Sequence, residues 1–262
     1  MNYMFAQKYP IVLVIYYYNK ILFNKEGYIL KFEKLIHGKL IKRYKRFLAD
    51  IILDSGLEIT AHVPNSGAMT SCIEDNCDVW VTHHDNPKRK LKYTLELTKM
   101  GENLICTNTG VANKIAVEAI ENGTIKELQG YDNLKPEQKY GNQNSRIDVL
   151  LWNDDSDKKC FVEIKSVSLN LGDTLAFPDA KTTRGQKHLE ELRDMVQEGH
   201  RAVMLYVIQR TDNLPFRIAS EIDKKYNEIF QEVTKQGVEV LVYQSDINFD
   251  EIQITKKVDY II

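Results

Sequence analysis

The 262-residue sequence is poor in the features that mark several large classes of protein. It has four cysteines, and their positions match no disulfide framework, which indicates reduced thiols in a cytoplasmic protein. Its apolar N-terminal segment, Ile11–Tyr18 followed by Ile21–Phe23, falls short of the roughly 20 residues that a membrane span needs. The net charge of -2 does not indicate a nucleic-acid-binding protein, so local basic patches must supply any such affinity.

Several kinds of catalytic or metal site are disfavoured as well. The sequence has no glycine-rich phosphate-binding loop, and no Gly-x-Ser-x-Gly motif supports a serine nucleophile. Cys72, Cys77, His83 and His84 lie close in sequence, but a gap of four residues and an adjacent histidine pair fit structural zinc sites poorly. We therefore expect neither a zinc site nor a covalent nucleophile.

The chain divides into two predicted domains near Cys106. Residues 1–32 are interpreted as an N-terminal extension, while an extra strand and a weak membrane or partner contact stay open as alternatives. Residues 33–106 contain short strands bounded by turn residues, which is typical of a small β-barrel or sandwich. We expect these strands at Leu57–Val63, Met69–Cys72, Val79–Thr82, Lys92–Lys99 and Asn103–Cys106.

Helical and strand patterns alternate over residues 107–246, which predicts a mixed α/β domain. The expected helices cover Ala112–Ile120, the segment from Thr182 to Gly199, and Ile222–Val233. The expected strands outside the central hairpin are Thr124–Leu128, Ala202–Gln209 and Val238–Tyr243. Residues 247–262 carry no strong pattern and are interpreted as a C-terminal tail.

A β-hairpin predicted over Ser145–Ser168 is the most informative stretch. Alternation places a row of apolar side chains on one face of its first strand: Ile147, Val149 and Leu151. Asp148 then lies on the other face, and Glu163 and Lys165 share a face of the second strand. We therefore expect two carboxylates and an ammonium group to meet beside one sheet.

This arrangement is compatible with a magnesium site that also binds phosphate. Mg²⁺ is held by one or two carboxylates plus substrate phosphate, and an ammonium group offsets negative charge that develops there. Glu137, just before the first strand, is a further candidate carboxylate. The alternative is cross-strand ion pairing, of Asp148 with Lys165 or of Glu163 with Arg146, which contributes at most about 1 kcal/mol. Spacing alone does not decide between the two.

Basic residues cluster in the predicted barrel and on the helix that follows the hairpin. A positive groove with aromatic platforms binds single strands in small barrels, and a solvated basic edge is the alternative. The turn Pro64–Gly67 offers amides and polar side chains to an anion. Arg184, Lys187 and His188 share one polar face of the helix. The barrel clusters are Lys39, Lys42, Arg43, Lys45 and Arg46, and then Lys88, Arg89, Lys90 and Lys92.

Several stretches between about Leu35 and Tyr243 carry a family resemblance. In order, they are Arg43–Ala49, His62–Gly67, Pro87–Leu91, Asn108–Asn113, Ser145–Asp148, Val162–Val167 and Phe177–Leu189. Through them the chain resembles the sugar fermentation stimulation protein A family, and Phe177–Leu189 is the most specific match. About thirty N-terminal residues have no counterpart in that family pattern, which favours the interpretation as an extension.

The resemblance implies an N-terminal OB-like β-barrel and a C-terminal domain with the PD-(D/E)xK nuclease fold. It also implies DNA binding and a link to the regulation of sugar use. Asp148, Glu163 and Lys165 map onto the acid and the Glu-x-Lys of that nuclease pattern, with Glu137 as the additional acid. These four would be catalytic, and the three carboxylates would bind Mg²⁺ or Mn²⁺. Ile147 stands at the position of Pro in the PD-(D/E)xK motif, and this position varies in that motif.

Two functions therefore stay open for a largely sequence-independent DNA-binding protein. One is a magnesium-dependent nuclease, and the other is a non-catalytic regulator of sugar (maltose) metabolism genes. The sequence does not decide between single- and double-stranded DNA, nor does it decide whether the protein is a homodimer. The expected DNA-binding residues are Arg43, Lys45, Arg46, Asn65, Lys88, Arg89, Lys90, Arg184, Gln186, Lys187 and His188.

Overall fold

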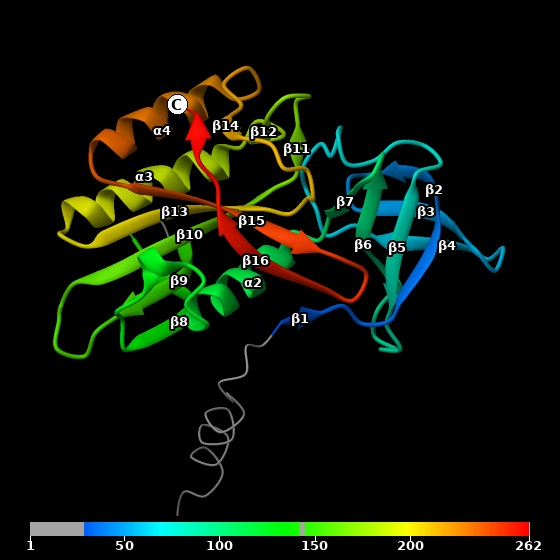
Figure 1. Ribbon diagram of the computed structural model, residues 1–262, viewed down its shortest axis with the longest axis horizontal. Coiled ribbons are helices and arrows are strands. Elements are labelled where there is room, and N and C mark those ends of the chain that lie inside the picture. Colours follow the sequence, from blue (N-terminus) through cyan, green and yellow to red (C-terminus); the bar gives the residue numbers. More distant parts are fainter. Residues whose placement is uncertain (1–28, 142–144, 262) are drawn as a thin grey trace, which may run out of the picture.

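The computed structural model describes residues 29–141 and 145–261 (Figure 1). The predicted N-terminal extension lies outside this range except for its last residues. Of these, strand β1 (Leu30–Lys31) pairs with β16 (Glu251–Lys257) at the edge of the largest sheet. Within the described ranges, no helix is both long and apolar enough to cross a membrane.

The first domain is a β-barrel (Figure 1, right). Its strands are β2 (Leu35–Tyr44), β3 (Leu48–Leu53), β4 (Glu58–His62), β5 (Asp78–His83), β6 (Tyr93–Met100) and β7 (Asn103–Cys106). Strands β4, β3, β2, β5 and β6 pair in that order, and the pairing of β4 with β6 closes the barrel. Alternating side chains such as Ala49 and Ile51 point inward, so each strand contributes one apolar row to the core.

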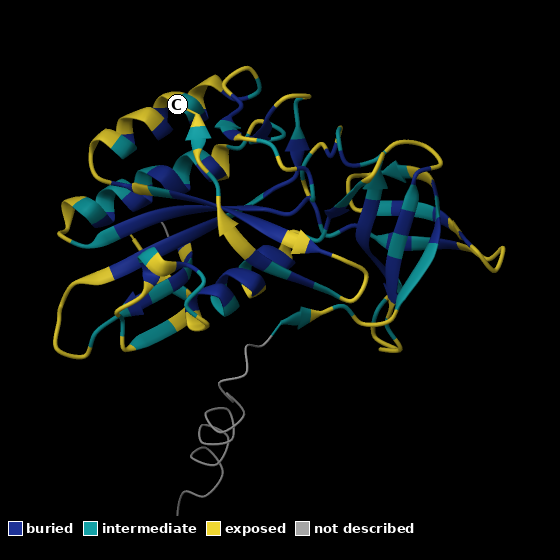
Figure 2. Cartoon of the chain, viewed as in Figure 1, coloured by how far each residue is buried: buried dark blue, intermediate teal, exposed yellow. Residues whose placement is uncertain are grey.

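The second domain is a mixed α/β domain built on a seven-stranded sheet. The strand order is β1-β16-β15-β13-β10-β9-β8, and its central strands β10, β13 and β15 are parallel. Those strands are almost entirely buried (Figure 2), as expected for a sheet covered on both faces. The strands are β8 (Asn133–Tyr140), β9 (Ser145–Trp152), β10 (Lys159–Val167), β13 (Arg201–Ile208) and β15 (Glu239–Ile247), besides β1 and β16.

Helices cover the two faces of this sheet (Figure 1). Helix α2 (Gly110–Glu121) packs on one face, and α3 (Thr183–Gln197) and α4 (Lys224–Lys235) pack on the other. Thr182 caps α3 by accepting a hydrogen bond from Gly185 N, and Asp223 caps α4 in the same way from Tyr226 N. A small sheet lies beside α3, with strands β11 (Leu169–Asn170), β12 (Leu175–Phe177), β14 (Phe216–Ile218) and β17 (Tyr260–Ile261).

Three expectations from the sequence are wrong. Met69–Cys72 forms turns instead of a strand. Thr124–Leu128 contains a short 3₁₀ helix, η1 (Lys126–Leu128), because Ile125 and Leu128 turn inward to pack in the α2 cluster. The segment 247–262 is not a separate tail, since β16 and β17 belong to two sheets and Ile252 and Ile254 are buried.

The two domains are joined by buried polar contacts as well as by the chain. The guanidinium of Arg210 forms an ion pair with Asp212 and donates to the carbonyl oxygens of Ser168 and, in the barrel domain, Ser71. Arg210 is only 3% exposed, so its contacts fix the two domains where water is excluded.

A second junction brings the turn Asn65–Gly67 against the segment before α3. Gly67 lies so close to Asp179 that an added Cβ would overlap the Asp179 carboxylate. The same carboxylate accepts a hydrogen bond from Met69 N at 3.2 Å. A Cβ at position 67 would therefore have to displace the Asp179 carboxylate from its hydrogen bond with Met69 N.

We predict that Gly67→Ala lowers the free energy of unfolding by about 1–3 kcal/mol, because overpacking at this junction costs that much. Urea titration followed by circular dichroism measures the change. In an Asp179→Ala background the same substitution should cost clearly less, because the overlapping carboxylate is gone. Equal costs in both backgrounds would contradict this explanation.

Candidate functional site

The candidate site forms where the antiparallel pairing of β9 and β10 ends. The last paired residues are Val149 and Val162, and one step further Asp148 Oδ2 accepts a hydrogen bond from Ile164 N at 2.7 Å. The Asp148 carboxylate thus accepts the amide hydrogen bond that a backbone carbonyl of β9 would accept if the strands were still paired. From α2, Asn113 Nδ2 donates to Asp148 Oδ1 at 2.8 Å. These two bonds fix the orientation of the carboxylate.

The expected alternation along β9 breaks at Asp148. Val149 and Leu151 pack in the cluster under α2, as expected, but Ile147 packs in the opposite cluster with α3 and α4. Glu137, which the β8–β9 register places opposite Asp148, has a φ of 54° and interrupts the ladder there. The prediction that Ile147 shares a face with Val149 is therefore wrong, because the local break changes which face each side chain uses.

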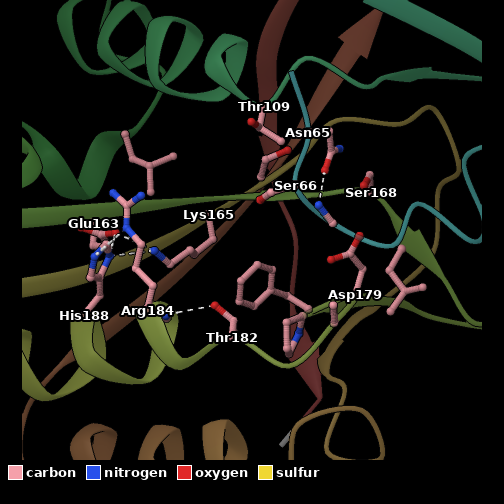
Figure 3. Close-up of a pocket in the computed structure, with 18 of the residues that line it drawn as sticks. Asn65, Ser66, Thr109, Glu163, Lys165, Ser168, Asp179, Thr182, Arg184 and His188 are labelled. Carbon is pink, nitrogen blue, oxygen red and sulfur yellow. Dashed lines mark hydrogen bonds and ion pairs between the residues drawn. The ribbon is translucent and has the colours of Figure 1, made fainter. Parts of the chain in front are cut away.

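Glu163 provides the second carboxylate and is 2% exposed. Its Oε1 atom accepts hydrogen bonds from Lys165 Nζ, at 2.5 Å, and from His188 Nδ1 on α3 (Figure 3). Its Oε2 atom is buried and has no hydrogen-bond partner. A buried carboxylate oxygen without a donor is costly, and a bound cation would compensate it.

The protein shifts the pKa values of the two carboxyl groups in opposite directions. Burial and, to a smaller extent, the nearby charge of Glu163 together raise the pKa of Asp148 to about 6. Burial acts in the same direction on Glu163, but Lys165 and His188 outweigh it and hold the pKa of Glu163 below its ordinary value. Glu163 is therefore ionised at neutral pH, and Asp148 is repelled by it. Two such carboxylates attract a divalent cation.

His188 is held by its own neighbour on α3. Arg184 Nε donates to His188 Nε2 at 3.3 Å, which favours a ring proton on Nδ1, toward Glu163. Lys165 Nζ lies 3.0 Å from His188 Nδ1. One turn of α3 thus positions the Glu-x-Lys pair of β10.

The third predicted carboxylate, Glu137, is placed differently. It lines the same cavity but is exposed, and Oε2 lies 3.4 Å from Arg146 Nη1. Over residues 29–141 and 145–261, no three His, Cys, Asp or Glu side chains are arranged to hold a metal ion. Asp148 and Glu163 alone fit a hard cation such as Mg²⁺, which keeps several of its waters and needs one or two carboxylates.

These side chains line a cavity of about 500 Å³ between the two domains (Figure 3). The α/β domain contributes the hairpin, the start of α2 and the start of α3. The barrel contributes Arg46, Asn65, Ser66 and Gly67. Of the predicted DNA-binding residues, Arg46, Asn65, Arg184 and His188 are therefore brought to the same cavity as the carboxylates.

Two of the predicted DNA-binding residues, Arg43 and Asn65, make hydrogen bonds that stabilise the protein itself. Arg43 donates to the carbonyl oxygens of Asn65, Gly67 and Ala68 and also of Arg46, which holds the turn. Asn65 is buried, where Nδ2 donates to Thr107 O and Oδ1 accepts from Gly67 N.

The remaining predicted residues lie apart from the carboxylate cavity. Gln186 donates to the Asp223 carboxylate at the α4 cap, and Lys187 lies 3.8 Å from Glu191. Lys88 and Lys90 are exposed between β5 and β6, and Arg89 donates to Thr94 there. Lys45, in contrast, lines a neighbouring cavity of about 400 Å³ that shares Arg46 with the main one.

The sequence reasoning missed Asn113, Thr109 and Asp179 as site residues. Asn113 and Thr109 stand in the Asn108–Asn113 stretch, where polar residues occur beside an apolar helical pattern. Asp179 stands in Phe-Pro-Asp, before a helix start. The sequence feature that could have identified these residues is their position near the start of a helix. Their role as site residues could not be recognised, because only the fold brings both helix starts to the hairpin.

Comparisons with known proteins agree with this two-domain architecture. The family model described as "SfsA N-terminal OB domain" matches residues 41–107, and "Sugar fermentation stimulation protein RE domain" matches residues 110–251. The solved structure of Pyrococcus furiosus SfsA in complex with Ca²⁺ superposes with a TM-score of 0.80 at 23% identity. That comparison covers 89% of this chain and 99% of the other, and it shows the same fold.

Curated relatives extend the match at higher identity. The sugar fermentation stimulation protein homolog of Marinomonas sp. is 51% identical over 233 residues, which cover 88% of this chain and 90% of the relative. The homolog of Pseudoalteromonas atlantica is 48% identical over 233 residues, covering 88% and 99%. With its OB barrel and its α/β domain both matched, the chain belongs to the sugar fermentation stimulation protein family.

Proposed function

We propose that the protein binds DNA and hydrolyses phosphodiester bonds at the Asp148–Glu163–Lys165 site, using Mg²⁺ or Mn²⁺. The observation that carries this proposal is the convergence of the buried Glu163 carboxylate, the half-buried Asp148 carboxylate and the Lys165 ammonium group in one cavity. Glu163 Oε2 is buried and makes no hydrogen bond within the described residues, which leaves it available to a cation. The Ca²⁺ complex of the Pyrococcus furiosus relative supports a divalent cation as the ligand.

Asp148 and Glu163 would hold the cation, and exposed Glu137 would have to leave its partner Arg146 to join them. When bound, the cation supplies a polarised phosphate and a coordinated water that loses its proton readily. The chain supplies the rest. Asn113 and Ile164 N orient the Asp148 carboxylate, and His188 orients that of Glu163. Lys165 is placed to offset the charge that develops on the phosphate.

Arg46 and Arg184 add cationic side chains to the same cavity. Guanidinium groups bind phosphate oxygens in a bidentate manner, so these residues would hold the backbone on either side of the scissile bond. Such contacts read no base sequence, which fits largely sequence-independent binding.

A specific observation also supports the second function, a non-catalytic DNA-binding regulator of sugar metabolism genes. Lys165 and His188 both bond to Glu163 Oε1, so the cluster is partly neutralised by the protein itself. A regulator could use such a site to bind a cation without hydrolysis. The experiments below distinguish the two.

The first prediction concerns cation binding. Asp148→Asn and Glu163→Gln should each weaken Mn²⁺ binding by more than the roughly 10–100-fold that loss of an outer partner costs. Isothermal titration calorimetry of the purified chain measures this. Asp154→Asn, an exposed carboxylate in the β9–β10 turn, is the control and should bind as the wild type. Unchanged binding in both site variants would exclude this cation site.

The second prediction concerns turnover. With Mg²⁺ or Mn²⁺ and labelled oligonucleotides, Lys165→Ala should lower kcat by a factor on the order of 10²–10³, because a charge-stabilising donor is lost. Lys159→Ala, at the exposed other end of β10, is the matched control and should leave kcat unchanged. Cleavage that persists in Asp148→Ala would refute the site assignment, and no cleavage by the wild type would favour the regulator.

The third prediction concerns salt. DNA affinity should fall as salt rises, and Arg46→Ala and Arg184→Ala should each reduce the slope of log K against log[salt] by about 0.7–0.9. Fluorescence anisotropy with Ca²⁺ in place of Mg²⁺ measures the slope. Arg193→Ala, whose guanidinium pairs with Asp194 elsewhere on α3, should not change it. A slope that is flat in the wild type would contradict the electrostatic explanation.

A further inference from the structure

The barrel turn does more than line the cavity, because it bridges the two walls of the cavity. We call the segment Pro64–Met69 the arch. At one end, Pro64 O accepts hydrogen bonds from Thr109 N, at 3.2 Å, and from Thr109 Oγ1, at 2.9 Å, where α2 begins. At the other end, Met69 N donates to Asp179 Oδ2, in the segment that leads into α3. The arch therefore connects the α2 wall with the α3 wall.

The arch is held in place along its whole length. Arg43 donates to three of its carbonyl oxygens, those of Asn65, Gly67 and Ala68. Asn65 is 5% exposed, and its side chain bonds back to Gly67 N and to Thr107 O. Gly67 also lies against Asp179 without room for a Cβ. These contacts describe a fixed bridge, in contrast to a lid that swings open.

The carboxylates and the arch line the same cavity. Asp148, Glu163 and Lys165 line it from the sheet, and Ser66 lines it from the middle of the arch. In Figure 3, Asn65 and Ser66 lie beside Thr109, and Asp179 lies beyond them, while Glu163 and His188 lie at the far end of the cavity. A substrate phosphate that reaches the carboxylates must share this space with the arch.

The size of the cavity limits what can enter. Cavities of about 300–1,000 Å³ hold one drug-sized ligand, which corresponds to roughly one or two nucleotides. At about 500 Å³, the cavity is of a size that suits a single strand. The neighbouring cavity of about 400 Å³ shares Arg46, Ser66, Gly67 and Ala180 with it and adds Lys45. A strand in the first cavity can therefore continue along basic residues into the second.

We propose that the substrate of this site is single-stranded DNA with a free end, which enters beneath the arch. This inference rests on the proposed function, because it names the substrate class of the same site. A closed circle cannot be threaded beneath a fixed bridge, and a duplex must first be opened. Cleavage therefore breaks a P–O bond near a strand end with water as the nucleophile, and one product oxygen takes the proton.

The test compares three substrates in Mg²⁺: linear single-stranded DNA, the same strand as a closed circle, and a covalently closed duplex circle. We expect the linear strand to be cut at least tenfold faster than either circle. Comparable cutting of the single-stranded circle would overturn the need for a free end. Comparable cutting of the duplex circle would overturn the strand preference, while the proposed hydrolysis would stand.

A binding measurement keeps the inference testable even if no substrate is cut, an outcome that would refute only the proposed hydrolysis. In Ca²⁺, the linear strand should bind at least tenfold more tightly than the single-stranded circle. Ser66→Trp, which fills the space beneath the arch, should remove that difference. Ser66→Ala and Thr70→Trp, the latter at an exposed position outside the cavity, should keep it. Equal affinity of the wild type for strand and circle would overturn the inference.

Discussion

The candidate site of the second domain depends on a cluster of charged side chains at the point where β9 and β10 separate. Glu163 is ionised inside the protein because Lys165 and His188 form hydrogen bonds with its carboxylate. Asp148 has a fixed orientation because its carboxylate accepts a hydrogen bond from Ile164 N. Taking charges out of water costs several kcal/mol per ion, so a cluster like this is not explained by stability alone. The unpaired Oε2 atom of Glu163 adds to that cost. The proposed binding of a cation and a phosphate would explain why the protein retains this cluster despite its free-energy cost.

The hairpin chemistry could be predicted from the sequence because it depends on local periodicity. Alternation correctly placed Glu163 and Lys165 on one face of β10, and apolar periodicity correctly indicated α2, α3 and α4. The face of Ile147 could not be predicted, since it depends on the positive φ of Glu137 on a neighbouring strand. Likewise, β16 is specified by its pairing with β15 and by packing under α2, which no local pattern in residues 247–262 reveals.

The roles of the basic residues could be predicted least well, because composition does not show where a guanidinium points. Arg43 and Arg46 lie in one basic cluster, yet Arg43 bonds to four carbonyl oxygens and Arg46 lines the cavity. The turn Pro64–Gly67 was recognised from its sequence, but its contacts with Thr109 and Asp179 depend on the docking of two domains. Gly67 and Asp179 thus meet at one junction between the domains, although 112 positions separate them in the chain.

The central claim is that Asp148 and Glu163 together form a divalent cation site. Anomalous diffraction from crystals soaked in Mn²⁺ tests it most directly. The account predicts a single strong peak between the two carboxylates, about 2.0–2.2 Å from their oxygens for a hard cation of this size. It also predicts that Lys165 Nζ moves away from Glu163 when the cation binds. Absence of a peak there, or a peak elsewhere with Lys165 still bonded to Glu163, would contradict the account.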